Sequence, residues 1–534
     1  MNAAADTPTA GEIRRPLSPM ERWYWICDQI SPLNVVARVR VQGTVPEGAL
    51  ARAGERLVAE HPLLRVAVTA GPDGGDPRFV GARDPRLPVR TVRCGESAPR
   101  RWEEEVDAIE LATPVDWRTG PLARLTDIAQ GTPGSPDACH DLVLTVSHVI
   151  ADGTTALELL RRVVDLAAAE AGPRAPGPAE PSAVPPGTAA PAQGAEGSAP
   201  AVSAAAPPGT AAPVGGTPDA GEGAGPGPGR PRPVLPAPEE MLPRRVAGLP
   251  RVLHCAAWTV ADQFAAVRAR PRRLRPSTPV PPELRRTRLI RRELSGEQLD
   301  LLVRRCREEG VTVHSALAAA MALAVADAEA EADGSRRRAA SVTVGSPVDF
   351  RGALTPRVEK EDAGAYVATV PSHVPVGPGA DLWSAARGAL RSLRRSRRFQ
   401  HALALVSLLR AICPRSVADS ARTIAMIDGS GPGNVCLSNI GRYDFPARAG
   451  SWRLSGAQFI AGISVSGCLV AAVNTTHGTL HWNVTHIDGA LPRDRAERIT
   501  DQAVHLLLQG IRPGGQPETA PGRAFAPGTT RTKG

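Results

Sequence analysis

A histidine, an aspartate and a glycine lie close together in the sequence His-Val-Ile-Ala-Asp-Gly at residues 148–153. They separate an apolar strand expected over residues 141–146 from an amphipathic helix expected over residues 154–169. A turn from strand to helix often presents an exposed side chain, and imidazole titrates near neutral pH. His148 could therefore take a proton from a hydroxyl or an amine and return it to a leaving group. From composition alone, a structural role for this histidine is the alternative interpretation.

Asp152 stands near the start of the expected helix, four residues after His148. Its carboxylate could cap the helix or form a buried ion pair that fixes the turn, so we expect it to organise the loop and not to contact substrate. The rest of the sequence contains no comparable catalytic motif. The sequence has no Gly-rich phosphate loop, no H-E-x-x-H and no G-x-S-x-G, which weighs against ATP use, zinc hydrolysis and a serine nucleophile. His314, on an Ala-rich helix, is interpreted as a polar cap or packing residue.

The patterning around this motif is mixed α/β. In the N-terminal part, residues 35–41 alternate as a strand and residues 47–60 place apolar side chains on one helical face. In the C-terminal part, residues 468–473 and 479–484 predict a hairpin around a turn at residues 475–478. Further elements expected there are a helix at 243–269 that ties the halves together, helices at 295–309, 313–331, 381–395, 401–412 and 493–508, and a strand at 340–344.

One segment differs from the rest in composition. Residues 171–230 hold 44 Ala, Gly or Pro among 60 positions and no Leu, Ile, Met, Phe, Trp or Tyr, so they cannot bury enough apolar surface to offset the entropy of ordering. We therefore divide the chain of 534 residues at this segment. The expected organisation is a disordered N-terminus at 1–16, a first lobe at 17–170, a disordered insertion at 171–242, a second lobe at 243–510 and a disordered tail at 511–534.

Charge and cysteine content argue against some classes of function. The net charge is +9, but 61 of the 63 basic residues are Arg, and their densest cluster, residues 268–292, is broken by prolines and lacks interleaved aromatic residues, which argues against nucleic-acid binding. Such a cluster also suits an anionic phosphopantetheine carrier, with a solvated basic linker as the alternative for most of these side chains. The eight cysteines show no metal spacing, so we expect free thiols and no metal site. The N-terminus lacks a secretory signal, and the longest apolar run, residues 316–326, is too short to span a membrane, so we expect a cytoplasmic protein.

The chain resembles the superfamily of condensation domains and polyketide-associated acyltransferases, whose members share the chloramphenicol acetyltransferase-like fold. The central match is the family's H-x-x-x-D-G motif, which stands here at His148, Asp152 and Gly153. Five further segments match in the family's order: 17–25 (LSPMERWYW), 60–65 (EHPLLR), 306–319 (CREEGVTVHSALAA), 345–354 (GSPVDFRGAL) and 438–441 (SNIG).

The resemblance implies both a fold and a chemistry. Two chloramphenicol acetyltransferase-like lobes would form a V-shaped pseudo-dimer with an active-site tunnel between them, and His148 would face that tunnel as general base. The donor would be an acyl thioester of coenzyme A or of an acyl or peptidyl carrier protein, and no cofactor would be bound. The acceptor would be a hydroxyl, or an amine, of a small molecule or lipid in natural-product or complex-lipid biosynthesis.

The same resemblance assigns the remaining site residues. Arg351 would be the salt-bridge partner of Asp152, with a surface loop charge as the alternative. Gly153 would allow close backbone approach, and its N–H is a candidate oxyanion donor near a helix N-terminus. Ser438 and Asn439 would line the tunnel or donate to the oxyanion, although a simple turn explains them almost as well.

One position departs from the family pattern. Many members have two consecutive histidines, and Ser147 replaces the first of them here. Since successive side chains of a strand point to opposite faces, we expect Ser147 to point away from the site. We therefore predict an acyltransferase, with a free-standing, amide-forming condensation domain as one alternative and a non-catalytic homologue that binds an acyl carrier as another.

Overall fold

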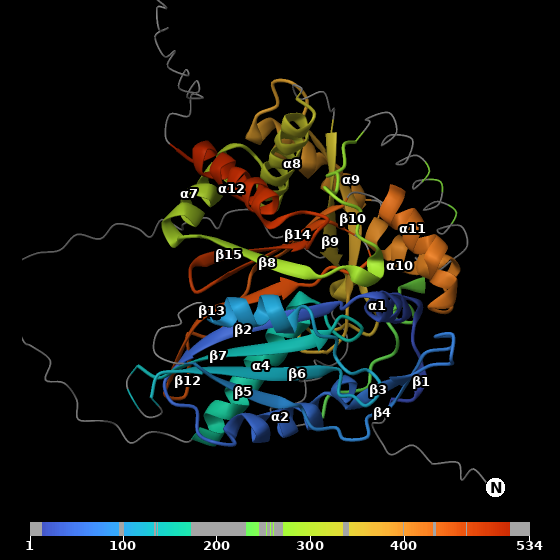
Figure 1. Ribbon diagram of the computed structural model, residues 1–534, viewed down its shortest axis with the longest axis vertical. Helices are drawn as coiled ribbons and strands as arrows, with labels where there is room; N and C mark the ends of the chain where they lie inside the picture. Colours follow the sequence, from blue (N-terminus) through green and yellow to red (C-terminus); the bar gives the residue numbers. More distant parts are fainter. Residues whose placement is uncertain are drawn as a thin grey trace, which may run out of the picture.

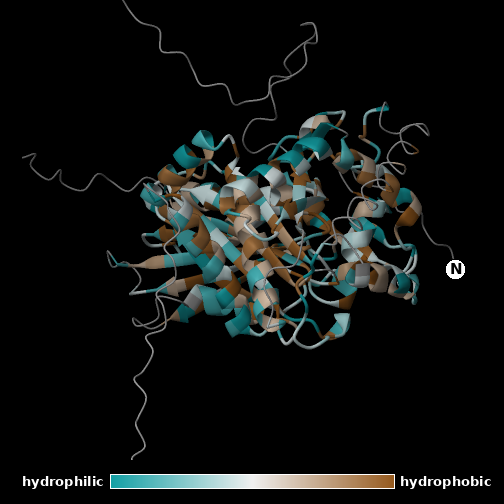
Figure 2. Cartoon of the chain, turned by 90° about the horizontal axis from the view of Figure 1, so that it is seen from above, coloured by the Kyte–Doolittle hydropathy of each residue, from teal (hydrophilic) through white to brown (hydrophobic). Residues whose placement is uncertain are grey.

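Two lobes, each built on a six-stranded sheet, make up the protein (Figure 1). The computed structural model describes residues 13–94, 101–132, 135, 137–171, 231–244, 253, 257, 260, 271–334, 341–398, 400–430, 434–465 and 467–512. Helices and strands alternate through both lobes, so the mixed α/β class and the two-lobed arrangement predicted from the sequence are confirmed. Figure 2 shows apolar stretches running through the middle of the molecule, with hydrophilic segments among the outer helices and loops.

The first lobe holds the strand that leads to the motif. Its sheet has the order β12-β13-β2-β7-β6-β5, and β7 pairs antiparallel with both β2 and β6. Apolar side chains from the strands and from two helices, α2 and α4, form one core, in which Leu57, Leu144 and Leu160 are fully buried. The bounds are β2 Asn34–Gln42, α2 Ala49–Glu60, β5 Val89–Cys94, β6 Ala123–Gln130, β7 Cys139–Ser147, α4 Gly153–Ala171, β12 Arg448–Ala449 and β13 Trp452–Ala461.

The second lobe has the sheet order β10-β9-β11-β14-β15-β8. The predicted hairpin is present as β14 and β15, and its turn places His477 and Gly478 at positive φ, as a two-residue hairpin turn requires. The helices α7, α8, α9 and α12 share the core of this lobe with the sheet. The bounds are β8 Thr287–Leu294, α7 Gly296–Glu308, α8 Val313–Ala332, β9 Ser341–Asp349, β10 Val367–Pro375, α9 Leu382–Arg398, β11 Val435–Arg442, β14 Leu469–Thr476, β15 Thr479–Ile487 and α12 Arg493–Gly510.

The helix α8 is apolar on all sides because it is buried on all sides. Its length and composition would suffice to cross a membrane, but 78% of its apolar window is buried inside the lobe, as in the core helix of a globular protein. Its many alanines allow the neighbouring helices to pack closely around it. The seven cysteines among the described residues are all free thiols.

The strand β13 lies in the sheet of the first lobe, although its sequence belongs to the second half of the chain. It pairs antiparallel with β2, with Phe459 opposite Ala37 and Ile460 opposite Val36. Its backbone also bonds to the second lobe, since Asn474 Oδ1 accepts the Phe459 N–H at 3.3 Å and Asn483 Nδ2 donates to the Phe459 carbonyl at 2.9 Å. The range 243–510 predicted for the second lobe therefore includes a strand that belongs to the sheet of the first lobe. The sequence of a strand does not show which sheet edge the strand will pair with.

Two segments expected to be disordered are partly built into the fold. In the N-terminal segment 1–16, Ile13 is buried and β1, Arg15–Pro16, pairs with β4, Arg78–Gly81. In the insertion 171–242, residues 231–242 pack against both lobes, because this end carries apolar side chains that residues 171–230 lack. The remaining parts of these segments, the tail from residue 513 and most of the helix expected at 243–269 lie outside the described residues.

Residues 231–242, here called the strap, join the two lobes by backbone bonds. The Arg232 N–H donates to the Glu60 carbonyl at 2.8 Å, and the Thr355 N–H donates to the Met241 carbonyl at 2.8 Å. Glu239 Oε1 accepts the Met20 N–H at 2.7 Å, at the first turn of α1, Pro19–Ile30. The strap is thus part of the interface between the lobes.

Met241→Ala should lower the free energy of unfolding by about 2–4 kcal/mol, because it leaves a cavity in a packed cluster that joins the lobes. Val234→Ala, on the same strap but 43% exposed, is the matched control and should change stability by less than about 0.5 kcal/mol. Denaturant unfolding of both variants checks this. Equal effects of the two substitutions would contradict the packing of the strap.

Candidate functional site

His148 lies at the end of β7, in the five-residue loop before α4. The sheet holds the loop in place, since the His148 N–H donates to the Leu33 carbonyl at 3.2 Å and the Ser147 N–H donates to the Leu122 carbonyl at 3.0 Å. Val149 and its two successors are buried, whereas His148 is half-buried. The loop therefore keeps one polar ring partly accessible within an apolar turn.

Ser147 is buried and turns back onto its own loop, where its hydroxyl accepts the Val149 N–H at 3.4 Å. It shares the strand end with His148 but makes no hydrogen bond to the imidazole within the described part of the chain. The Nδ1 atom of His148 is buried without a hydrogen-bond partner among these residues. A serine–histidine nucleophile pair is therefore not formed here.

Tyr24 on α1 lies flat against the imidazole of His148. The ring centroids are 4.2 Å apart and the planes differ by 10°. Tyr24 falls within the matched segment 17–25, but that match gives no sign of the stacking. Nothing in the spacing of α1 tells which of its three neighbouring aromatic side chains reaches the loop, because that depends on how the helix lies over β7.

Asp152 organises the loop in two ways at once. Its Oδ1 atom accepts the Thr155 N–H at 3.0 Å, which caps α4, and the Tyr366 N–H reaches Oδ2 at 2.9 Å. Arg351 Nη2 lies 2.9 Å from the carboxylate. The side chain is 2% exposed, so no lone pair is left free for substrate. Helix capping and a buried ion pair, which the sequence offered as alternatives, are both present.

Arg351 comes from the second lobe and crosses to the motif. It begins the short helix η4, Arg351–Ala353, and its guanidinium also binds Thr155 Oγ1 at 2.7 Å and Asp349 at 2.9 Å. The Tyr366 ring covers one face of the guanidinium, with a centroid 4.8 Å away. The structure thus brings Asp152 and Arg351 together across 199 residues of sequence.

The electrostatics of this pair favour the charged forms. Burial alone would raise the pKa of Asp152, but the Arg351 charge and the hydrogen bonds hold that pKa below its ordinary value. Burial would likewise lower the pKa of Arg351, and the two aspartates raise it instead. His148 differs, because burial is the largest influence and lowers its pKa, so the imidazole is neutral at pH 7. The loop therefore holds one fixed anion and one neutral base.

Gly153 is required by the close approach of a strand from the other half of the chain. A Cβ atom at this position would lie 2.6 Å from the ring of Phe459 on β13. The residue is also the first of α4, where the backbone N–H groups are free of helix partners. The predicted close backbone approach thus involves a protein side chain.

Ser438 and Asn439 lie on β11 in the sheet of the second lobe, and both are half-buried. Asn439 Oδ1 accepts the Gly441 N–H at 2.8 Å, beside an irregularity in the pairing with β14. Both residues are thus part of a strand with a local irregularity, and not of the simple turn that the sequence offered as the alternative. Neither side chain has a hydrogen bond to the motif loop within the described residues.

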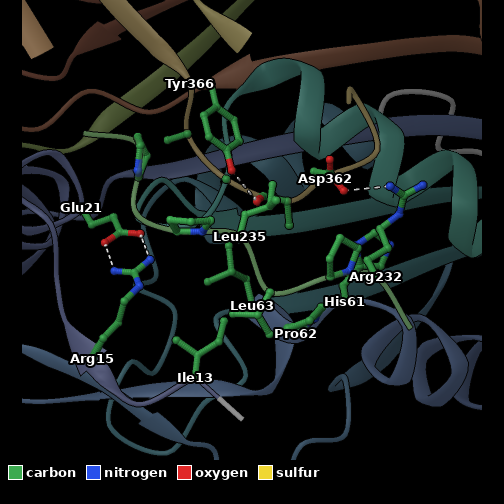
Figure 3. Close-up of a pocket in the computed structure, with 17 residues that line it drawn as sticks. Ile13, Arg15, Glu21, His61, Pro62, Leu63, Arg232, Leu235, Asp362 and Tyr366 are labelled. Carbon is green, nitrogen blue, oxygen red and sulfur yellow. Dashed lines mark hydrogen bonds and ion pairs between the residues drawn. The ribbon is translucent and has the colours of Figure 1, made fainter. Parts of the chain in front are cut away.

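A pocket lies against the strap (Figure 3). Its walls come from the strap, from His61 and its neighbours, and from residues 362–366, and Figure 3 shows the Arg232–Asp362 ion pair at one side. Neither His148 nor Asp152 lines it. The His61 Nδ1 atom is buried without a partner, and burial lowers the His61 pKa to about 4. We interpret this pocket as incomplete packing between the strap and the lobes.

Comparison with known proteins relates this geometry to a fold family. Residues 283–449 match the family model of the phthiocerol/phthiodiolone dimycocerosyl transferase C-terminus. The chain is also similar to the solved epimerization domain from the third module of tyrocidine synthetase B, with 15% identity and a TM-score of 0.60 over 95% of this chain and 98% of that one. No curated protein matches the chain by sequence.

The chain has the condensation-domain fold. The resemblance to the condensation domains and polyketide-associated acyltransferases is thereby confirmed for the fold, which is chloramphenicol acetyltransferase-like. Two further structures agree: polyketide synthase associated protein 5 from Mycobacterium tuberculosis (17% identity, TM-score 0.54, 94% of this chain and 98% of that one), and the starter condensation domain of rhizomide synthetase in complex with C8-CoA (15% identity, TM-score 0.59, 95% and 96%). In this condensation-domain fold the motif loop is fixed by an ion pair between the lobes.

Arg351→Ala should lower the free energy of unfolding by about 3–5 kcal/mol, because it leaves the buried Asp152 carboxylate without its counter-charge. The double variant with Asp152→Asn should lose less than the sum of the single effects. Arg498→Ala, which breaks a surface pair with Asp494, is the control and should change stability little.

The pH dependence follows from the depressed pKa of Asp152. The stability that this pair contributes is complete above the unfolded-state pKa of about 3.9, and it is lost as the pH falls through the folded value. Arg351→Ala should therefore weaken the acid dependence of unfolding. If denaturant titrations at several pH values show the same slope in both proteins, the pair does not carry this stability.

Gly153→Ala should destabilise the fold by about 1–3 kcal/mol, because the new methyl group overlaps the Phe459 ring. Phe459→Leu in the same chain should recover part of that loss by opening space. Gly352→Ala is the matched control, since nothing lies within 4 Å of its Cβ position. Thermal unfolding of the four proteins gives the comparison, and a harmless Gly153→Ala would contradict the close approach.

Proposed function

We propose that the protein is an acyltransferase that moves an acyl group from a thioester to a hydroxyl acceptor, with His148 as the general base. The observation that carries this proposal is a neutral, half-buried imidazole in a loop that both lobes hold rigidly. The match of residues 283–449 to a transferase family supports the reaction class. Natural-product or complex-lipid biosynthesis is the proposed setting.

The proposed reaction runs through one tetrahedral intermediate. His148 takes the proton of the acceptor hydroxyl as its oxygen attacks the thioester carbonyl. The carbon–sulfur bond then breaks, and the imidazolium returns the proton to the leaving thiolate, which departs as a thiol. An ester, or an amide from an amine acceptor, is left as product, and the base ends the cycle neutral.

Asp152 has a separate role in this scheme. Its carboxylate is occupied by Arg351 and by two backbone N–H groups, so it stays ionised and accepts no proton during turnover. Its charge acts on the imidazolium at a distance and raises the His148 pKa against the effect of burial. The Gly153 N–H is the proposed oxyanion donor, because it stands at the free N-terminus of α4.

The donor is proposed to be coenzyme A or a phosphopantetheine carrier protein. One similar structure is described as a starter condensation domain in complex with C8-CoA. The net charge of +9 also suits an anionic donor. We place the reaction in the cytoplasm, which agrees with the free thiols among the described cysteines.

His148→Ala should lower kcat by about 10²–10⁴-fold, because the acceptor proton then has no base. His505→Ala, at an exposed position on α12, is the control and should retain full activity. The measurement is product formation by intact mass, with a panel of acyl thioesters and hydroxyl or amine acceptors.

The same assay separates the alternatives. Transfer to amines only would favour an amide-forming condensation domain. Acyl-carrier binding without turnover by the wild-type protein would favour a non-catalytic homologue. Full activity of His148→Ala would exclude the imidazole as base while leaving the reaction class intact.

A further inference from the structure

The stacking of Tyr24 on His148 has a geometry that can orient the imidazole of a general base. The two rings are nearly parallel, with centroids 4.2 Å apart, so the phenol covers one whole face of the imidazole. The stack engages the face of the imidazole and not its edge, where the nitrogen atoms lie, although Nδ1 is buried by other parts of the fold. A stacked neighbour thus restricts rotation of the imidazole without using either nitrogen.

Tyr24 is held firmly enough to act as a support. The helix α1 begins with a capping box in which Ser18 and Glu21 bind each other's backbone N–H groups, and Arg15 pairs with Glu21 at 2.6 Å. At the other end of the side chain, the Tyr24 hydroxyl donates to the Val367 carbonyl of β10 at 3.5 Å. The ring is therefore fixed by contacts in both lobes.

The ionisable groups near the His148 imidazole only partly offset the effect of its burial. Burial lowers the His148 pKa, and the backbone groups of His148 and Ala151 together with the Asp152 carboxylate oppose that effect. The ionisable groups that act on Tyr24 are Asp152, Cys27 on α1 and Cys436 on β11, and burial raises the pKa of both thiols, so they are neutral at pH 7. Burial also raises the pKa of Tyr24 and keeps the phenol neutral.

Asp152 cannot compensate fully for the burial of the imidazole. Arg351 neutralises its charge at 2.9 Å, and Thr155 and Tyr366 donate to the same carboxylate. The face of an aromatic ring, in contrast, carries partial negative charge and attracts a cation stacked on it more than a neutral ring. Tyr24 is the residue that presents such a face to His148.

We propose that Tyr24 is a positioning residue for the base: its ring holds the plane of the His148 imidazole and stabilises the imidazolium that forms when the acceptor proton is taken. This inference rests on the function proposed above. In this proposal the aromatic ring of Tyr24, and not its hydroxyl, orients and stabilises the imidazole. The hydroxyl contact with Val367 then fixes the orientation of the Tyr24 ring.

The test compares Tyr24→Phe, which keeps the ring, with Tyr24→Leu and Tyr24→Met, which remove it. Trp23→Leu is the matched control, because it removes an aromatic side chain from the next position of the same helix. The first readout is the His148 pKa by NMR titration of the histidine-labelled full-length protein, with the signal assigned by His148→Gln. The second is the pH profile of kcat.

We expect Tyr24→Leu and Tyr24→Met to lower the His148 pKa by about 0.5–1 unit, the loss of roughly one cation–π contact. The acid limb of the kcat profile should move to lower pH by the same amount, and kcat at its plateau should fall about tenfold as the ring loses its orientation. Tyr24→Phe should behave as wild type in both readouts, and Trp23→Leu should leave the His148 pKa unchanged.

The outcomes separate the two proposals. An unchanged His148 pKa in folded Tyr24→Leu or Tyr24→Met would overturn the role of the ring. A loss of activity in Tyr24→Phe equal to that in Tyr24→Leu would also overturn it, because the hydroxyl would then be the part that matters. If the His148 pKa shifts as expected but the wild-type protein transfers no acyl group, the electrostatic role stands and the proposed function fails.

Discussion

The fold depends at its centre on one buried ion pair between residues 199 positions apart in sequence. Asp152 and Arg351 are each taken out of water, which is costly, and the cost is offset because every remaining lone pair and most donors find partners. The carboxylate caps α4 and binds the backbone of the segment before β10, while the guanidinium binds Thr155 and Asp349. Such a pair contributes geometry more than net stability, since it fixes how the second lobe meets the loop of His148.

Around that pair, further contacts between the lobes also hold the motif loop in place. Thr155 Oγ1 donates to the Gly364 carbonyl, and Ala151 forms a bridge with Gly364. On the other side of the loop, Phe459 leaves room only for glycine at position 153. The H-x-x-x-D-G spacing thus describes a loop in which the aspartate and the glycine are fixed by the opposite half of the chain, and the histidine is left partly accessible.

Much of this could be predicted from the sequence, where local patterns decide the outcome. The periodicity gave α4, α8, α9, α10 (His401–Ile412) and the hairpin of β14 and β15 close to their observed bounds, and the pairing of Asp152 with Arg351 followed from the family resemblance. Contacts that depend on packing across the fold could not be predicted. No local signal tells that Tyr24, among three neighbouring aromatic residues of α1, stacks on His148. The sequence also does not say that β13 joins the first sheet, or that the strap packs, because those outcomes depend on open edges and surfaces elsewhere.

The position of β13 has a consequence for synthesis on the ribosome. The edge of β2 that β13 covers is made early, but its partner emerges only after residue 461, some 419 residues later. At about 5–20 residues per second, that edge stays unpaired for roughly 20–80 s in every nascent chain. An open strand edge invites pairing with other chains, and charged side chains discourage it. Arg38 and Arg40 stand on β2 itself, where they would keep neighbouring nascent chains apart until the sheet closes.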